Sequence, residues 1–161
     1  MTNQNELIVK MVLDAWYAKV QDTDKLLAEI SDEQLQKEVA PNRNRGIYLL
    51  GHLTAVNDKL LPLLGFGEQK FSQLNEPFLT KADKAVAEIP SASDLRNYWT
   101  AANTALAKYF SSMKADEWFE KHTSVSAEDF AKEPHRNRLN VLISRTNHLA
   151  YHNGQLAFLK N

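Results

Sequence analysis

The sequence predicts an all-α fold, a four-helix bundle with two long connections, and three observations lead to this prediction. The 161 residues include only five glycines and five prolines. Apolar residues recur at helical spacing over long stretches, whereas the alternation that is typical of β-strands is scarce. The length fits a single domain over residues 1–161, and 43% apolar with 24% charged residues is the composition of an ordinary globular chain.

The first two helices are predicted at residues 5–30 and 32–39. Apolar side chains in the first segment recur every three or four positions, which is typical of a helix with one buried face. The polar residues 22–24 weaken this pattern before it resumes. Ser31 followed by Gln34 has the form of a capping box, which favours a separate short helix after it.

A second long helix is predicted at residues 45–64. Asn44 is a suitable N-cap for it, and the glycine-containing stretch 64–67 ends it. Residues 68–92 then form a long connection with a short helix expected at 81–88. Connections of this length usually serve a function or wrap around the domain.

The third and fourth long helices are predicted at residues 93–113 and 138–159, and Asn137 is the expected cap of the fourth. Residues 114–137 form a second long connection between them, in which Pro134 stops any helix. Its aromatic residues are expected to anchor it to the helices: Trp118, Phe119 and Phe130.

Two histidines, His148 and His152, stand four residues apart in the fourth helix. Residues at this spacing lie on one face about a turn apart, so both imidazoles can reach the same metal ion. Both fall towards the same edge of the buried face that Leu149 marks. Leu149 also occupies the position where a His-Glu-x-x-His protease needs its glutamate, so a metalloprotease is not expected.

A third histidine, His52, shares a mainly apolar helix face with Tyr48 and is predicted to point inward. Gly51 beside it would let a neighbouring group approach closely. Three inward histidines on two helices can bind one divalent ion, zinc or nickel, and leave positions open for water or substrate. The alternative is that each histidine is a hydrogen-bonded polar group near the core. His122 and His135 lie in the second connection and are expected in solvent.

Two arginines are placed near the predicted site. Arg145 lies seven residues before His152, and Arg45 lies seven residues before His52. An arginine at the mouth of the site could hold a carboxylate or the acidic group of a thiol cofactor. The alternative is that the side chain reaches solvent or pairs with a surface carboxylate, and we expect this alternative for Arg45.

Three further side chains are candidates for supporting roles. Gln155 follows His152 by three residues and could orient a histidine or a bound water, or it could serve packing or capping. Tyr48, one turn before His52, could bring its hydroxyl near the metal, although a buried aromatic contact is the expected role. Asp58 lies about 120° from His52 on the helical wheel, so it is not expected to act as a general base.

Charge and composition exclude several function classes. Lys and Arg number 19 and Asp and Glu 20, a net charge of -1, which predicts neither nucleic-acid nor membrane-surface partners. The absence of cysteine excludes disulfides, thiolate ligands and a cysteine nucleophile. No signal peptide and no apolar run near the roughly 18 residues of a membrane span are visible, so we expect a cytoplasmic protein.

Two motifs carry a family resemblance: Gly-His-Leu at 51–53 and, much later, His-x-x-x-His-x-Gly-Gln-Leu at 148–156. In this order they resemble the DinB superfamily, also called the YfiT-like metal-dependent hydrolases. The helix order and loop lengths fit over nearly the whole chain. The resemblance implies a four-helix bundle, often a homodimer, with a divalent metal at one end bound by His52, His148 and His152.

The resemblance also implies a class of activity. Family members include bacillithiol and mycothiol S-transferases and a mycothiol-dependent maleylpyruvate isomerase. We therefore expect a metal-dependent enzyme, a thiol S-transferase or a hydrolase, that acts on a small-molecule substrate. A divalent ion deprotonates a coordinating thiol, and a chain without cysteine fits a low-molecular-weight thiol as cofactor. The alternative is a non-catalytic protein that binds a metal or a stress-related small molecule.

Overall fold

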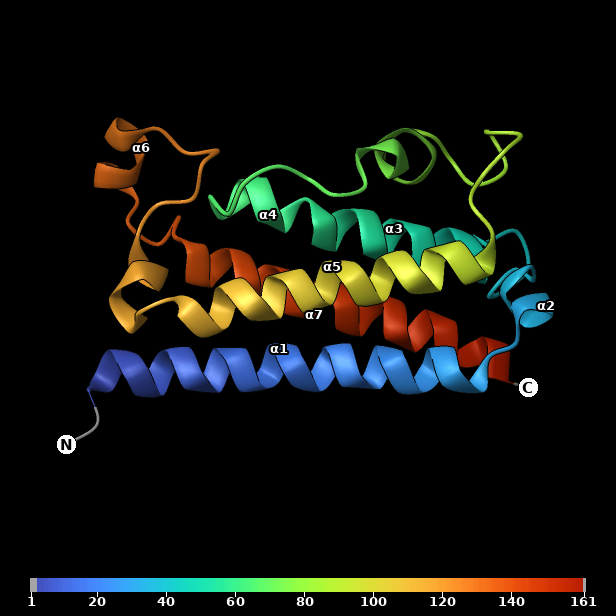
Figure 1. Ribbon diagram of the computed structural model, residues 1–161, viewed down its shortest axis with the longest axis horizontal. Helices are drawn as coiled ribbons and strands as arrows, with labels where there is room; N and C mark the ends of the chain where they lie inside the picture. The colour runs from blue at the N-terminus through green and yellow to red at the C-terminus, as the bar shows by residue number, and fades with distance from the viewer. Residues whose placement is uncertain (1–2, 161) are drawn as a thin grey trace.

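The computed structural model describes residues 3–160, which form helices and turns without a β-strand (Figure 1). Four long helices run along the long axis of the molecule: α1 (Gln4–Glu29), α3 (Gly46–Asp58), α5 (Ala92–Ser112) and α7 (Arg138–Leu156). Shorter segments connect them: α2 (Asp32–Leu35), α4 (Leu60–Leu63), η1 (Ser72–Leu74), η2 (Glu76–Thr80), η3 (Ala115–Phe119), α6 (Ala127–Lys132) and η4 (Ala157–Lys160). The prediction of an all-helical chain is confirmed.

The core lies between the four long helices. Helix α1 packs on α7, α5 packs on α3, and α3 also contacts α7. Trp16 from α1, Trp99 from α5 and Trp118 from η3 are among the largest side chains that are fully buried. Burying one large apolar side chain stabilises the fold by roughly 1.5–3 kcal/mol. Within residues 3–160, no helix has both the length and the apolar composition that a membrane crossing requires.

Helix α1 continues without interruption through the polar stretch 22–24. Thr23 is fully buried, and its hydroxyl lies 2.8 Å from the amide oxygen of Asn153 on α7. The Asn153 amide in turn donates to the Lys19 carbonyl at 3.2 Å. The polar residues therefore form part of the contact between α1 and α7, and this contact keeps the segment helical.

Two of the predicted helix caps are confirmed. Ser31 and Gln34 form a reciprocal capping box at the start of α2, although α2 ends at Leu35 and does not reach residue 39. The Asn137 side chain accepts a hydrogen bond from the Asn140 N–H at 2.9 Å and caps α7. Each such cap stabilises its helix by roughly 1 kcal/mol.

The predicted cap of α3 is wrong. Its N-cap is Arg45, not Asn44, and no side chain caps the helix locally. Instead, the Asp83 carboxylate accepts the Arg45 backbone N–H at 2.7 Å and the guanidinium at 2.7 and 3.0 Å. A carboxylate that is 38 residues away in the sequence thus replaces the local cap.

The predicted helix over residues 45–64 is divided into α3 and α4. The helix is interrupted at Lys59. Pro62 has no N–H to donate to the carbonyl of residue 58, so the regular hydrogen bonds of α3 cannot continue there. Gly65 then adopts a left-handed φ of 82°, which ends α4 as the glycine in stretch 64–67 predicted.

The predicted short helix at residues 81–88 is wrong. This segment forms turns, and Lys84 within it has a φ of 70°, outside the helical region. The helical part of the connection lies earlier, in η1 and the π-helical η2, which pass over α3 (Figure 1). The fully buried Asp58 anchors its start by accepting the N–H groups of Lys70 and Phe71 at 3.0 and 2.9 Å.

The second connection is anchored by aromatic residues as predicted, with one difference. Trp118 is fully buried and meets Phe110 of α5 edge-on at 5.0 Å between ring centroids. Phe119 also packs against the core, whereas Phe130 is partly buried on α6 and does not reach the core cluster. Thr123 fastens the connection to α4 by donating its backbone N–H to the Leu63 carbonyl at 3.0 Å.

Candidate metal centre

The three predicted histidines meet where α3 and α7 pack together. The Nε2 atom of His148 lies 3.1 Å from the Nε2 atom of His52 and 3.0 Å from that of His152. One ligand atom of each of the three side chains falls within 4.8 Å of the others. Nitrogen ligands at about 2.0–2.1 Å from a tetrahedral zinc are roughly 3.3 Å apart, so this spacing is close to that of a metal site.

The outer nitrogens of two of these histidines are fixed by hydrogen bonds. His52 Nδ1 donates to the Phe78 carbonyl of η2 at 2.8 Å. His152 Nδ1 donates to the Gln155 side-chain oxygen at 2.6 Å. An imidazole that donates from Nδ1 keeps a free lone pair on Nε2, so both rings turn a lone pair towards His148.

This hydrogen-bond pattern fits a cation. A proton on His148 Nε2 can form a hydrogen bond to only one of the two facing lone pairs, that of His52 or that of His152. The other lone pair is then left without a hydrogen-bond donor. A divalent ion among the three Nε2 atoms satisfies all of them at once. Metal-bound histidines usually donate their outer N–H to a fixed acceptor such as a backbone carbonyl, which is the partner of His52. The Gln155 amide oxygen fixes His152 in the same way.

Two of the three histidines, His148 and His152, have lowered pKa values that favour the neutral imidazole. Burial, together with the neighbouring His152, His52 and Arg145, lowers the pKa of His148 to about 4. Burial also lowers the pKa of His152, against the hydrogen bond to Gln155, which raises it. Metal ions bind the neutral imidazole. A site whose histidines are already neutral therefore releases no protons from them when it binds a metal ion at neutral pH.

In the metal-free protein we expect the His148 imidazole to stay neutral until the pH falls to about 4. The unfolded chain takes up this proton near the ordinary value of 6.5, so between pH 6.5 and 4 the unfolded state binds more protons. The free energy of unfolding should therefore fall as the pH is lowered through this window. NMR titration of the imidazole and urea unfolding at several pH values measure both effects.

The matched variant for this titration is His148→Asn, which keeps a polar side chain that does not titrate. It should lose less stability than the parent between pH 6.5 and 4. An imidazole signal that titrates near 6.5 in the folded parent would contradict the expected burial effect.

Removal of the Gln155 amide should weaken metal binding without removing a ligand. Gln155→Ala leaves His152 Nδ1 without its acceptor, and loss of such a partner typically costs about 10–100-fold in metal affinity. Competition with a chromogenic chelator measures the change. Gln155→Glu, which keeps an acceptor oxygen, should retain most of the affinity; equal affinity in Gln155→Ala and the parent would refute an orienting role.

Of the other candidate side chains, Arg145 lies near the histidines, whereas the polar groups of Tyr48, Arg45 and Asp58 bind elsewhere. The Tyr48 ring stacks on His52 at 6.3 Å between centroids, while its hydroxyl donates to the Lys81 carbonyl and so points away from the histidines. Arg45 pairs with Asp83, as the alternative for this arginine predicted. Arg145 is partly buried close to His148. Asp58 serves the loop backbone and does not reach the histidines.

Neither of the other two histidines joins the cluster. His135 is exposed, as expected, whereas His122 is partly buried in a cavity that Arg145 also lines. The Phe78 carbonyl is the site group that sequence reasoning missed. Gly51 was the available signal: a Cβ there would lie 2.5 Å from Cδ1 and from Cζ of Phe78, so the glycine lets η2 approach His52.

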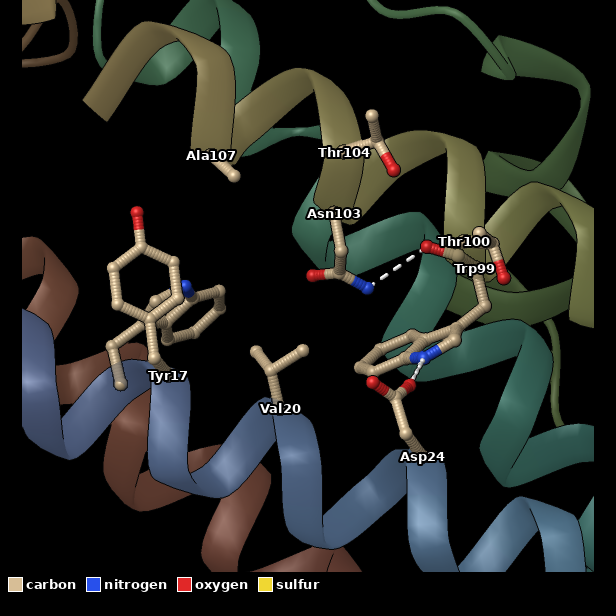
Figure 2. Close-up of a pocket in the computed structure, with 9 residues that line it drawn as sticks. Tyr17, Val20, Asp24, Trp99, Thr100, Asn103, Thr104 and Ala107 are labelled. Atoms are coloured by element: carbon tan, nitrogen blue, oxygen red, sulfur yellow. Dashed lines mark hydrogen bonds between the residues drawn. The ribbon is translucent and has the colours of Figure 1, made fainter. Parts of the chain in front are cut away.

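A groove of about 280 Å³ lies between α1 and α5, away from the histidine cluster (Figure 2). Four of the polar side chains that line it are already hydrogen-bonded: Asp24, Trp99, Thr100 and Asn103. The Trp99 indole donates to Asp24 at 2.7 Å, and the Asn103 amide donates to the Trp99 carbonyl at 2.9 Å. The Asn103 oxygen accepts from Asn57 at 2.9 Å. The groove therefore lacks the converging free ligands that distinguish the histidine cluster.

An all-helical chain with three converging histidines on two of its long helices defines a class of protein that is able to hold a metal ion. The chain belongs to the DinB superfamily, whose family model matches residues 15–156. This confirms the family resemblance of the two histidine motifs.

A solved structure supports the fold. The crystal structure of a conserved protein from Enterococcus faecalis is similar to this chain, with a TM-score of 0.65 and 14% sequence identity. The similarity covers 99% of this chain and 96% of that one, and at this identity it concerns the fold alone. No curated protein matches the sequence.

Proposed function

We propose that this protein is a divalent-metal-dependent enzyme that acts on a small molecule, with zinc or nickel bound by His52, His148 and His152. The observation that carries the proposal is the convergence of three Nε2 atoms, with His148 Nε2 at 3.0 and 3.1 Å from the other two. Membership of the DinB superfamily supports it. A divalent ion in this position supplies Lewis acidity, which lowers the pKa of a bound thiol or water.

The side chains around the histidines have separate roles in this proposal. The Phe78 carbonyl and Gln155 orient the rings of His52 and His152 through their Nδ1 atoms. The Tyr48 ring covers one face of His52 and limits its rotation. Arg145, one turn before His148, binds the substrate or cofactor with its guanidinium.

Thiol transfer is the reaction class that this environment favours over hydrolysis. Among residues 3–160, no Asp or Glu side chain hydrogen-bonds to the three histidines, and the buried Asp58 is held by loop N–H groups. Hydrolysis needs a base to take protons from water, whereas a metal-bound thiol has already lost its proton. The chain has no cysteine, so the thiol would come from a low-molecular-weight cofactor.

The domain organisation and oligomeric state that we propose are those that the family resemblance implies. We propose one domain over the whole chain, with α1, α3, α5 and α7 as a four-helix bundle, and a homodimer in the cytoplasm. The family match over residues 15–156 supports a single domain. The net charge of -1 speaks against nucleic acid as a partner.

The test begins with metal content. Protein purified without chelators and reconstituted with zinc or nickel should bind one equivalent of metal per chain. The loaded protein is then given low-molecular-weight thiols and an alkylating electrophile, and formation of the S–C bond is followed together with loss of the thiol. Absence of bound zinc and nickel after reconstitution would refute the proposal. Tight metal binding without any effect of thiols or electrophiles would favour the non-catalytic alternative.

A further inference from the structure

Two adjoining cavities lie between α4, the first half of α7 and the connection that contains Thr123. Their volumes are about 260 and 390 Å³, and both are lined by Leu63 and Arg145. Among residues 3–160, their lining includes Lys59, Arg136 and His122 but no Asp or Glu. We call these two cavities the cationic cleft.

Arg145 is the central side chain of the cationic cleft. It is partly buried, and burial lowers its pKa without a neighbouring carboxylate to offset the effect. Within residues 3–160 the guanidinium takes part in no hydrogen bond or ion pair, whereas Arg45 binds Asp83 and Arg138 binds Glu120. Its five N–H donors are therefore free to bind a ligand.

The other cations of the cleft lie around Arg145. Lys59 is exposed and pairs with no carboxylate in the described part of the chain. Arg136 keeps a half-exposed pair with Glu133 at 3.2 Å, and such surface pairs contribute little energy. The Thr123 hydroxyl lies 3.0 Å from the Pro62 carbonyl, which ties the rim of the cleft to α4. The positive charge is thus concentrated on a wall that the fold holds in place.

We propose that the cationic cleft binds an oxyanion group, a carboxylate or a phosphate, of the small molecule whose reactive end reaches the three histidines. Arg145 is one helical turn before His148, a rise of about 4.5 Å along α7, so the cationic cleft and the histidines are neighbours along this helix. Arginine donates two parallel hydrogen bonds to such groups. That the anion belongs to the substrate or thiol rests on the proposed function, whereas anion binding itself does not.

The test uses the metal-free protein, so that an anion cannot bind through a metal. Inorganic phosphate and acetate are titrated separately at constant ionic strength, and backbone amide shifts are followed by NMR. Saturable shifts should be confined to the segments that line the cleft, residues 59–63, 122–124 and 136–145. Tighter binding of phosphate or of acetate tells which oxyanion the cleft prefers.

Arg145→Gln should weaken binding of the preferred anion about tenfold, and Arg145→Lys should restore part of the loss. The matched control is Arg43→Gln, which removes one exposed arginine outside the cleft and should change affinity less than twofold. Circular dichroism checks that each variant is folded. If Arg145→Gln does not fold, Lys59→Gln replaces it, with a weaker but measurable loss expected.

Two results would overturn the proposal: no saturable shifts with either anion, or equal weakening by Arg145→Gln and Arg43→Gln, which would reflect net charge alone. These results are distinct from failure of the proposed function. Anion binding in a protein that takes up neither zinc nor nickel would support the cleft and refute the metal enzyme. Metal uptake without anion binding would refute the anion site in the cleft and leave the proposed metal enzyme standing.

Discussion

Replacement of His148 by alanine is expected to abolish stoichiometric binding of zinc or nickel. His148 is the central member of the cluster, because its Nε2 atom lies 3.1 Å from that of His52 and 3.0 Å from that of His152. Loss of an outer partner alone costs up to about 100-fold in metal affinity, so loss of one of three ligands should cost more than this. Metal analysis after dialysis and chelator competition measure the change.

A matched histidine outside the cluster provides the control. His135→Ala removes an exposed imidazole from the second connection and should leave the metal content at one equivalent per chain. His52→Ala should behave like His148→Ala, because it also removes one of the three nitrogens. One equivalent of tightly held metal in folded His148→Ala would show that the ion binds elsewhere.

The histidine cluster was predictable because much of its geometry is local. Two histidines four residues apart share a helix face wherever the helix is placed, and Gln155 reaches His152 for the same reason. The inward direction of His52 followed from the apolar face around it. Only the approach of α3 to α7, which brings His52 within 3.1 Å of His148, required the family resemblance or the structure.

The parts that the sequence did not reveal depend on contacts between distant residues. Asn44 has the right chemistry for a cap, yet Asp83 takes over this function from the far side of a long connection. Residues 81–88 form turns, and Asp83 within them is held by the Arg45 backbone N–H and guanidinium. No local pattern contains this information, since each contact is formed only once the long helices have assembled.

Arg45 and Arg145 each lie seven residues before a histidine, so the spacing alone allows the same anion-binding role for both. The structure separates them, because Arg45 faces the Asp83 carboxylate whereas Arg145 faces a cavity without acidic side chains in the described residues. Sequence spacing gives the direction of a side chain on its own helix, but its partner comes from another element.

Gly51→Ala is expected to lower both the stability of the protein and its affinity for the metal. A Cβ at this position would lie 2.5 Å from Cδ1 and from Cζ of Phe78, a separation at which the ring must shift. Overpacking of this kind typically costs about 1–3 kcal/mol of stability. The Phe78 carbonyl accepts a hydrogen bond from His52 Nδ1 at 2.8 Å. Displacement of η2 should therefore also weaken metal binding about tenfold or more.

The same substitution at Gly154 separates this effect from a general response of helices to alanine. Gly154 lies within α7, and a Cβ there meets no atom within 4 Å. Gly154→Ala should therefore raise the free energy of unfolding by roughly 0.5–1 kcal/mol, because alanine loses less conformational freedom in a helix. Urea unfolding of the metal-free proteins measures both changes, and chelator competition measures affinity. If Gly51→Ala were as stable and bound metal as tightly as Gly154→Ala, the contact with Phe78 could not be what positions His52.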